Sequence, residues 1–254
     1  MYQRRNPRRE YDASPLQETR LAVYFQSPRP QLLPGLLYSA FRQDLPEYEL
    51  IQKHAEVDQD TAEVRWGPDH MLSNSRRNLA VLLGSGYLAM IARQPYVGFS
   101  DFLDFSNCCW DKFKDTVEQG TIHQVRLLYQ NLIALPSLEA NPSEYVKGGV
   151  FVAPSPLFED WSVEHMKADV VFQVSSSLSV RLISQVIGGS EPAITLNLEA
   201  ISDGRVAADL GGWCQEANQV LGDLFEDFLT DAVKRTFQPR QIGESEDGLA
   251  NSAS

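Results

Sequence analysis

The sequence predicts an α+β fold with two subdomains of antiparallel sheet, each covered by a long amphipathic helix. Three observations support this prediction. Short runs of β-branched and aromatic residues alternate with Gly, Pro, Ser and Asp turn signals in both halves of the chain. Aromatic residues recur at helical spacing over residues 95–117, and apolar residues form a continuous stripe over residues 213–237. Each helix needs an apolar surface to cover, and the nearest one is the sheet of its own half.

The distribution of charge and of turn residues divides the chain into four expected parts. Residues 1–14 are rich in arginine and poor in apolar side chains, so we expect a disordered basic tail. A linker near residues 136–150 separates an N-terminal α+β subdomain, residues 15–140, from a C-terminal one, residues 141–238, which holds a meander and a long helix. We expect residues 239–254 to be a disordered acidic tail.

In the N-terminal half, residues 18–26 predict a strand and residues 32–41 a short helix. Two further strand candidates, residues 48–57 and 61–68, are separated by an Asp-rich turn. Further along, the sequence predicts a helix that is entered from Pro95, and its aromatic residues are expected to be core.

Residues 78–95 contain a string that fits the dinucleotide-binding fingerprint, from Gly84 through Gly86 to Ala89. That fingerprint needs a following helix with its amino terminus at a pyrophosphate. Pro95 comes only six residues after Ala89, which leaves too little chain for such a helix. We therefore expect a β-hairpin whose Gly-Ser-Gly loop supplies positive φ, with a nucleotide site as the alternative.

Residues 123–136 alternate apolar and polar side chains and predict a strand. Val125, Leu127, Tyr129 and Asn131 share its covered face. Because a buried tyrosine hydroxyl needs a partner, we expect Tyr129 and Asn131 to form a structural polar pair rather than a catalytic cluster.

In the C-terminal half, residues 166–176, 178–189 and 193–202 predict three consecutive strands of an antiparallel meander. The apolar stripe that follows predicts one uninterrupted helix from Trp213 to Phe237, stopped by Pro239.

The chain has 254 residues and a formal net charge of -12, so its surface repels phosphate backbones on average. The one basic cluster is in the tail, and it leaves a nucleic-acid arm as an alternative role for Arg4, Arg5, Arg8 and Arg9. Three cysteines without a regular spacing indicate a reducing compartment and buried thiols. No apolar stretch has the length of a leader or a membrane span, so we expect a cytoplasmic protein with no membrane partner.

Motifs for nucleophilic catalysis, phosphate binding and zinc binding are missing from the sequence, and the four histidines are scattered singly. We therefore expect no catalytic residues, no metal and no cofactor. The strongest remaining candidates are Asp223, Asp227 and Asp231, which are spaced to share one helical face. That face predicts either a solvated surface or, alternatively, a Mg²⁺ site of an enzyme.

Four short motifs resemble a sporadically distributed family of bacterial proteins of about this length that has no established biochemical activity. The motifs are Pro15-Leu16-Gln17-Glu18, Pro95-Tyr96 with Phe99 and Phe102, the strand from Arg126 to Leu132, and Phe225, Phe228, Thr230 and Asp231. In the strand, Leu132 replaces the arginine of the family pattern, and Leu127 and Leu128 separate Arg126 from Tyr129. The resemblance covers about residues 15–238 and implies no catalytic residues.

These observations favour a non-enzymatic protein-binding module of α+β type, which binds another subunit or a copy of itself. We expect a subunit or regulator of a bacterial accessory system, such as a defence or toxin–antitoxin-like system. The alternatives are a Mg²⁺-dependent enzyme that uses the three aspartates and a nucleic-acid binder that uses the N-terminal arginines.

Overall fold

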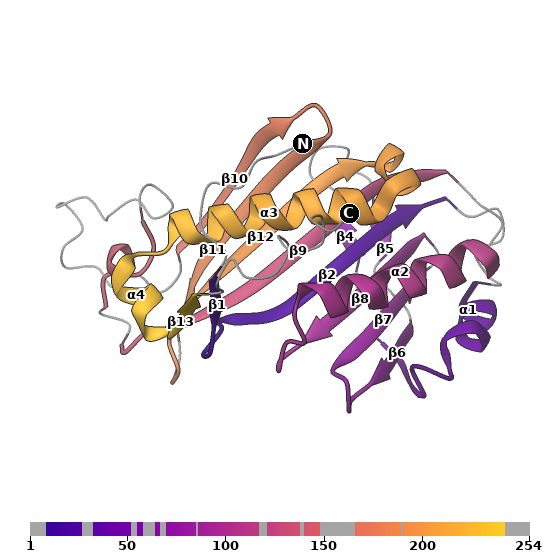
Figure 1. Ribbon diagram of the computed structural model, residues 1–254, viewed down its shortest axis with the longest axis horizontal. Coiled ribbons are helices and arrows are strands. Elements are labelled where there is room, and N and C mark those ends of the chain that lie inside the picture. The colour runs from indigo at the N-terminus through magenta and orange to yellow at the C-terminus, as the bar shows by residue number, and fades with distance from the viewer. Residues whose placement is uncertain are drawn as a thin grey trace, which may run out of the picture.

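The protein has an α+β fold built on one nine-stranded antiparallel sheet (Figure 1). The computed structural model describes residues 9–26, 33–51, 55–57, 64–66, 70–84, 86–116, 121–137, 140–147, 166–188 and 190–241. Within these residues the strand order is β10-β11-β12-β9-β2-β8-β7-β6-β3. The strands are β2 (Leu16–Phe25), β3 (Glu47–Leu50), β6 (His70–Asn74), β7 (Leu79–Gly84), β8 (Tyr87–Arg93), β9 (Ile122–Ala134), β10 (Met166–Ser175), β11 (Leu178–Ile187) and β12 (Ala193–Asp203).

Two short strand pairs and several helices complete the described part of the chain. β1 (Arg9–Tyr11) pairs with β13 (Pro239–Gln241), and β4 (Ala55–Val57) pairs with β5 (Val64–Trp66). The α-helices are α1 (Leu33–Phe41), α2 (Phe99–Thr116), α3 (Leu210–Phe228) and α4 (Asp231–Thr236), and the 3₁₀ turns are η2 (Pro142–Glu144) and η4 (Gly204–Asp209).

The sheet runs unbroken across the boundary expected near residue 140. β9 precedes that boundary and β12 follows it, yet the two strands pair from Ala193 opposite Ala134 to Asp203 opposite Gln124. β9 also pairs with β2 on its other side. One hydrophobic cluster includes residues from both halves, so the division into two separate subdomains is not confirmed.

Helices α2 and α3 lie on the same face of this sheet, with α3 across β9 and β12 and α2 beside β8 (Figure 1). The apolar stripe of each helix points into the shared core, where Trp110 and Phe113 of α2 and Trp213 and Leu221 of α3 are buried. Strands β9 and β11 alternate buried and more exposed residues, because one face of each strand lies under the described helices.

The opposite face of β2, β7 and β8 carries a second, smaller apolar cluster that includes Ala22, Leu82, Ala89 and Ile91. Strand β7 is consequently buried along its whole length, and β8 along all but its last residue. Strands with two covered faces consist of continuous apolar runs, which explains why residues 79–92 are almost all apolar.

The hairpin expected at residues 78–95 is confirmed, because β7 and β8 pair antiparallel and Gly84 lies opposite Tyr87. The reason expected for Gly86 is wrong, since its φ lies outside the positive region. A Cβ atom at Gly86 would lie 2.7 Å from the carbonyl oxygen of Phe25, and the Phe25 amide donates to the Gly86 carbonyl at 3.0 Å. Glycine is needed there for close approach to β2 rather than for its backbone freedom.

The single helix expected from Trp213 to Phe237 is wrong, because α3 ends at Phe228 and α4 begins at Asp231. Leu229 is extended and bridges to Val146. The Thr230 hydroxyl caps α4 by accepting from the Val233 amide at 3.3 Å, and it donates to the Glu144 carbonyl at 2.6 Å. An apolar stripe does not reveal this break, since both helices bury their stripes in the same core.

Parts of both expected disordered tails are ordered. Arg9–Tyr11 of the basic tail pairs with Pro239–Gln241 of the acidic tail as β1 and β13. The Tyr11 ring packs edge-on against Phe225 and Phe237, with centroid distances of 6.2 and 5.8 Å. This aromatic contact anchors a segment whose own sequence is too polar to predict order.

Candidate functional site

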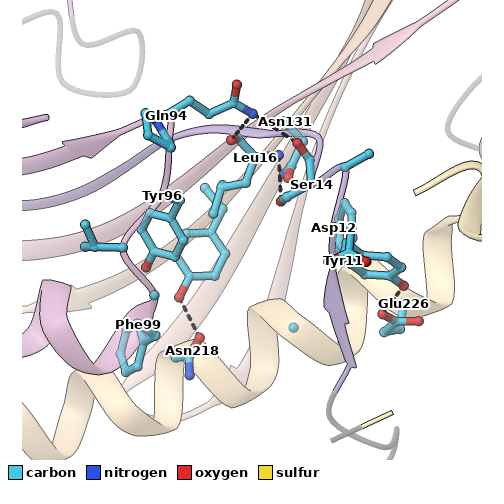
Figure 2. Close-up of a pocket in the computed structure, with 17 residues that line it drawn as sticks. Tyr11, Asp12, Ser14, Leu16, Gln94, Tyr96, Phe99, Asn131, Asn218 and Glu226 are labelled. Carbon is cyan, nitrogen blue, oxygen red and sulfur yellow. Dashed lines mark hydrogen bonds between the residues drawn. The ribbon is translucent and has the colours of Figure 1, made fainter. Parts of the chain in front are cut away.

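A hollow lined by polar and aromatic side chains lies between α3, β9, the segment before β2 and the connection from β8 to α2 (Figure 2). Its volume is about 660 Å³, and seventeen of the described residues line it. That volume lies within the range of roughly 300–1,000 Å³ that small-molecule sites occupy. We refer to it below as the α3 cavity.

Regular elements fix the position of the polar groups in the α3 cavity. Tyr129 and Asn131 are two residues apart on β9 and so point to the same covered face. Asn218, Gly222 and Glu226 follow each other at intervals of four along α3, which places them on one helical face. The walls of the cavity are therefore a strand face and a helix face rather than loops alone.

The pair expected between Tyr129 and Asn131 does not form. The Tyr129 hydroxyl donates to Asn218 Oδ1 at 2.6 Å, across the core from β9 to α3 (Figure 2). The Asn131 amide nitrogen donates to the carbonyl of Leu196 on β12 at 3.0 Å. Both side chains are buried, as expected, but each finds its partner on a different element because neighbours on one strand face point in parallel.

Glu226 connects three elements at one end of the cavity. The Tyr11 hydroxyl of β1 donates to Glu226 Oε1 at 2.5 Å, and Lys234 Nζ of α4 lies 3.3 Å from Glu226 Oε2. Glu226 and Lys234 are both buried, and a buried carboxylate is tolerated only when it is paired and hydrogen-bonded. This arrangement holds α4 and the N-terminal segment against α3.

The connection from β8 to α2 forms the opposite wall. The Gln94 amide nitrogen donates to the carbonyls of Ser14 and Leu16, at 3.0 and 2.8 Å, and so ties this connection to the segment before β2 (Figure 2). Burial raises the pKa of Tyr96 to about 12, an effect that the hydroxyl of Thr19 partly opposes. The Tyr96 ring reaches inward from the wall, and its hydroxyl oxygen is closed off from solvent.

The three aspartates proposed as an acidic face do not form one set, because Asp223 and Asp227 are one turn apart on α3 whereas Asp231 lies beyond the end of that helix. Asp223 is 1% exposed on the core side of α3, whereas Asp227 is exposed. Asp231 belongs to α4, beyond the helix break, and its carboxylate lies 4.0 Å from Lys147 Nζ. Among the residues that the structure describes, no group of three metal-ligating side chains is found. The geometry on which the Mg²⁺ hypothesis depends is therefore missing.

Of the four arginines proposed as a nucleic-acid arm, only Arg9 belongs to the residues that the structure describes. Arg4, Arg5 and Arg8 lie outside the described residues. The backbone of Arg9 belongs to β1, opposite Gln241.

The thiols are free, and two of the three are buried as expected. Burial raises the pKa of the Cys109 and Cys214 thiols well above their usual value. Cys108 is exposed, so the expectation that all three are buried is wrong. Adjacent residues of a helix point in different directions, and this explains why only one of the Cys108-Cys109 pair reaches the core.

The sheet has a second notable feature at its edge, where β10 pairs with β11 and with no other described strand (Figure 1). Four of its apolar side chains are substantially exposed: Val170 at 39%, Val171 at 62%, Phe172 at 40% and Val174 at 38%. We refer to residues 170–174 as the β10 edge. The other edge strand, β3, is shorter, with four residues that comprise two glutamates and the exposed Tyr48 and Leu50.

Sequence reasoning missed Tyr11, Asn218 and Glu226 as residues of the cavity. One signal could have indicated that a cavity borders α3: a polar residue and a glycine, Asn218 and Gly222, lie four positions apart beside the apolar stripe. Nothing local marks Tyr11, because its contacts depend on residues more than two hundred positions away.

In the described part of the chain, no helix combines the length and the apolar character needed to span a bilayer. A search with protein-family models and a search of curated proteins both find no match to this chain.

Proposed function

We propose that the protein is a non-enzymatic protein-binding module that pairs an extended segment of another chain with the β10 edge. The observation that carries this proposal is the run of four exposed apolar residues on a long strand at the border of the sheet. An unpaired edge offers backbone donors and acceptors that an added strand can use, and alternate side chains then set specificity.

The register of β10 indicates what an added strand would contact. Val170 lies opposite Leu182 and Phe172 lies opposite Val180, and both of these β11 residues are fully buried. Val170 and Phe172 thus extend the helix-covered core face to the border of the sheet. A partner strand with apolar residues at every second position would continue that face.

Charge does not protect this edge. Asp169, the nearest acidic residue, is paired with Arg181 of β11 at 2.6 Å, and residues 170–175 carry no charged side chain. A register shift between Gln173 and Ser175 marks where regular pairing with β11 is interrupted. The pairing surface therefore consists mainly of the residues before Ser175.

The partner is another subunit or a second copy of this chain. The expected role in a bacterial accessory system, of the defence or toxin–antitoxin-like kind, belongs to the same proposal. Identifying a partner as the product of a neighbouring toxin, nuclease or transporter gene would support that role.

The experiment is affinity capture of the full chain from its native host, followed by size-exclusion chromatography with light scattering. Three forms are compared: the unchanged chain, Val171→Lys at the β10 edge, and Leu36→Lys on α1 as a control that also replaces an exposed apolar residue, one that is 47% exposed. We expect the unchanged chain and Leu36→Lys to yield a stoichiometric complex or a dimer, and Val171→Lys to yield a monomer. A lone monomer from the unchanged chain, or an equal loss in both variants, would contradict the proposal.

A further inference from the structure

An edge strand can pair with the identical strand of a second copy of the same chain. A two-fold rotation about an axis normal to the sheet reverses the strand direction, as antiparallel pairing requires, and keeps each face of the sheet on its own side. On β10 such pairing would continue the row of Val170 and Phe172, which lies in line with the buried Leu182 and Val180 of β11. The helix-covered faces of both copies would then lie on one side of a joined sheet.

Charge favours β10 over β3 as the strand that meets a second copy. Each chain carries a formal net charge of -12, so two copies repel each other unless they meet where few charges lie. Residues 170–175 are uncharged, and the carboxylate of Asp169 is paired with Arg181 of its own sheet. β3 has only four residues, which include Glu47 and Glu49. Pairing of β10 with β3 of the next copy, which would build an open chain of molecules, therefore brings two carboxylates into the interface.

The order of side chains along β10 favours one register for a symmetric pair. With Val171 on the two-fold axis, Val171 lies opposite its own copy, and Val170 lies opposite Phe172 on both sides of the axis. Pairs of an aromatic and a β-branched side chain are among the cross-strand pairs that stabilise antiparallel sheets. Asp169 then lies opposite Gln173, so charges of like sign do not face each other.

The neighbouring registers are less favourable. With Asp169 on the axis, two carboxylates would lie directly opposite each other, which destabilises a sheet. With Val170 on the axis, the Asp169 carboxylate would lie opposite the apolar Val171. With Phe172 on the axis, the pairing would extend into the register shift at the end of the regular ladder between β10 and β11.

We propose that the protein forms a two-fold dimer in which the β10 edges of two copies pair antiparallel, with Val171 on the axis. This inference rests on the proposed function, because it names the partner of the same edge. In the dimer the Cα atoms of the two Val171 residues lie about 4.5–5.5 Å apart, within the range of roughly 4.4–6.8 Å that a disulfide bridges. Residues away from the axis are farther from their own copies, and the two Gln173 residues are separated by about 14 Å along the strands.

Single cysteines test this register. The exposed Cys108 is first replaced by Ser, whereas the buried Cys109 and Cys214 are kept. Val171→Cys is compared with Gln173→Cys, a matched control at an exposed position on the same face of β10. Both purified full chains are oxidised under identical mild conditions and separated by non-reducing electrophoresis.

We expect Val171→Cys to form a disulfide-linked dimer and Gln173→Cys to form almost none. Equal yields from the two variants would indicate random collision rather than a defined interface. Equal yields, a higher yield from Gln173→Cys or no link in either variant would overturn the proposal.

Light scattering of the purified unchanged chain tests the dimer without a cysteine. The expected mass is twice that of one chain. Val171→Lys, which would place two like charges opposite each other on the axis, should raise the dissociation constant of the dimer by at least about tenfold, whereas Leu36→Lys on α1 should leave it unchanged.

A purified chain that stays monomeric at every concentration tested would overturn the self-pairing. A different protein that is captured from the host by this monomer, and is lost in Val171→Lys, would still support the proposed function. The failure of the dimer is therefore distinguishable from the failure of the β10 edge as a binding site.

Discussion

The contact between Glu226 and Lys234 gives the most demanding test of how the C-terminal helices are held together. Their side chains are only 6% and 11% exposed, and the Nζ to Oε2 distance is 3.3 Å. Replacing Lys234 by Met removes the ammonium group, so the buried Glu226 carboxylate loses this ion pair. Breaking a buried pair in this way costs about 3–5 kcal/mol.

The double variant Glu226→Gln with Lys234→Met tests whether the cost comes from the remaining charge. Because no uncompensated charge stays buried, we expect the double variant to lose less stability than Lys234→Met alone. In a chain of this length, a loss of about 3 kcal/mol lowers Tm by roughly 6–12 °C. Urea unfolding and thermal unfolding, each followed by circular dichroism, measure the free energy of unfolding and Tm of the two variants. If Lys234→Met loses under about 1 kcal/mol, or as much as the double variant, the two groups do not stabilise each other as the structure indicates.

Three further outcomes are expected. Gly204→Ala should lower the free energy of unfolding in urea by about 3 kcal/mol or more, because the new Cβ would lie 1.7 Å from the carbonyl oxygen of Ile122. Gly35→Ala on α1 has open space around it and should raise the free energy of unfolding by up to about 1 kcal/mol. Burial raises the pKa of Tyr96 to about 12, whereas an unfolded tyrosine titrates near 10. The contribution of Tyr96 to the free energy of unfolding should therefore be fully present below about pH 10 and be lost as the pH rises towards 12. This loss should be smaller in Tyr96→Phe, and an identical pH profile of the two proteins would contradict the assignment. Iodoacetamide should add one label per native chain, at Cys108, because the other two thiols are buried and their pKa values are raised. Rapid labelling of Cys109 or Cys214, detected by mass spectrometry, would show that the core opens.

The elements that the sequence predicts well are those whose side chains repeat with a simple period. β9 alternates over its length, β11 and β12 follow as an antiparallel meander, and α2 shows aromatic residues at helical spacing. In each case the buried face belongs to the element itself, so local pattern is enough.

The elements that the sequence does not predict depend on distant partners. The break after Phe228 is fixed by contacts of Thr230 with Glu144 and Tyr145, residues that precede α3 by more than sixty positions. The order of residues 9–11 depends on the ring of Phe237 and on β13. Glu226 meets Lys234 because the chain turns at the break, since on one unbroken helix the two residues would be separated by about 12 Å along the axis.

The candidate sites follow the same division. The exposed run on β10 is visible in the sequence as an apolar strand, but its place at the border emerges only from the strand order. The α3 cavity combines residues from four separate segments, and their convergence is a property of the fold. The motifs for catalysis and phosphate binding, in contrast, are local strings, which is why the sequence alone could argue against them.

Hydrogen–deuterium exchange of the full chain with and without its captured partner tests the role of the β10 edge most directly. Backbone amides that gain a strand partner exchange more slowly. We predict that exchange slows across residues 166–175 and stays unchanged across residues 47–50 of β3. A partner that stays bound while exchange in residues 166–175 does not change would contradict the account.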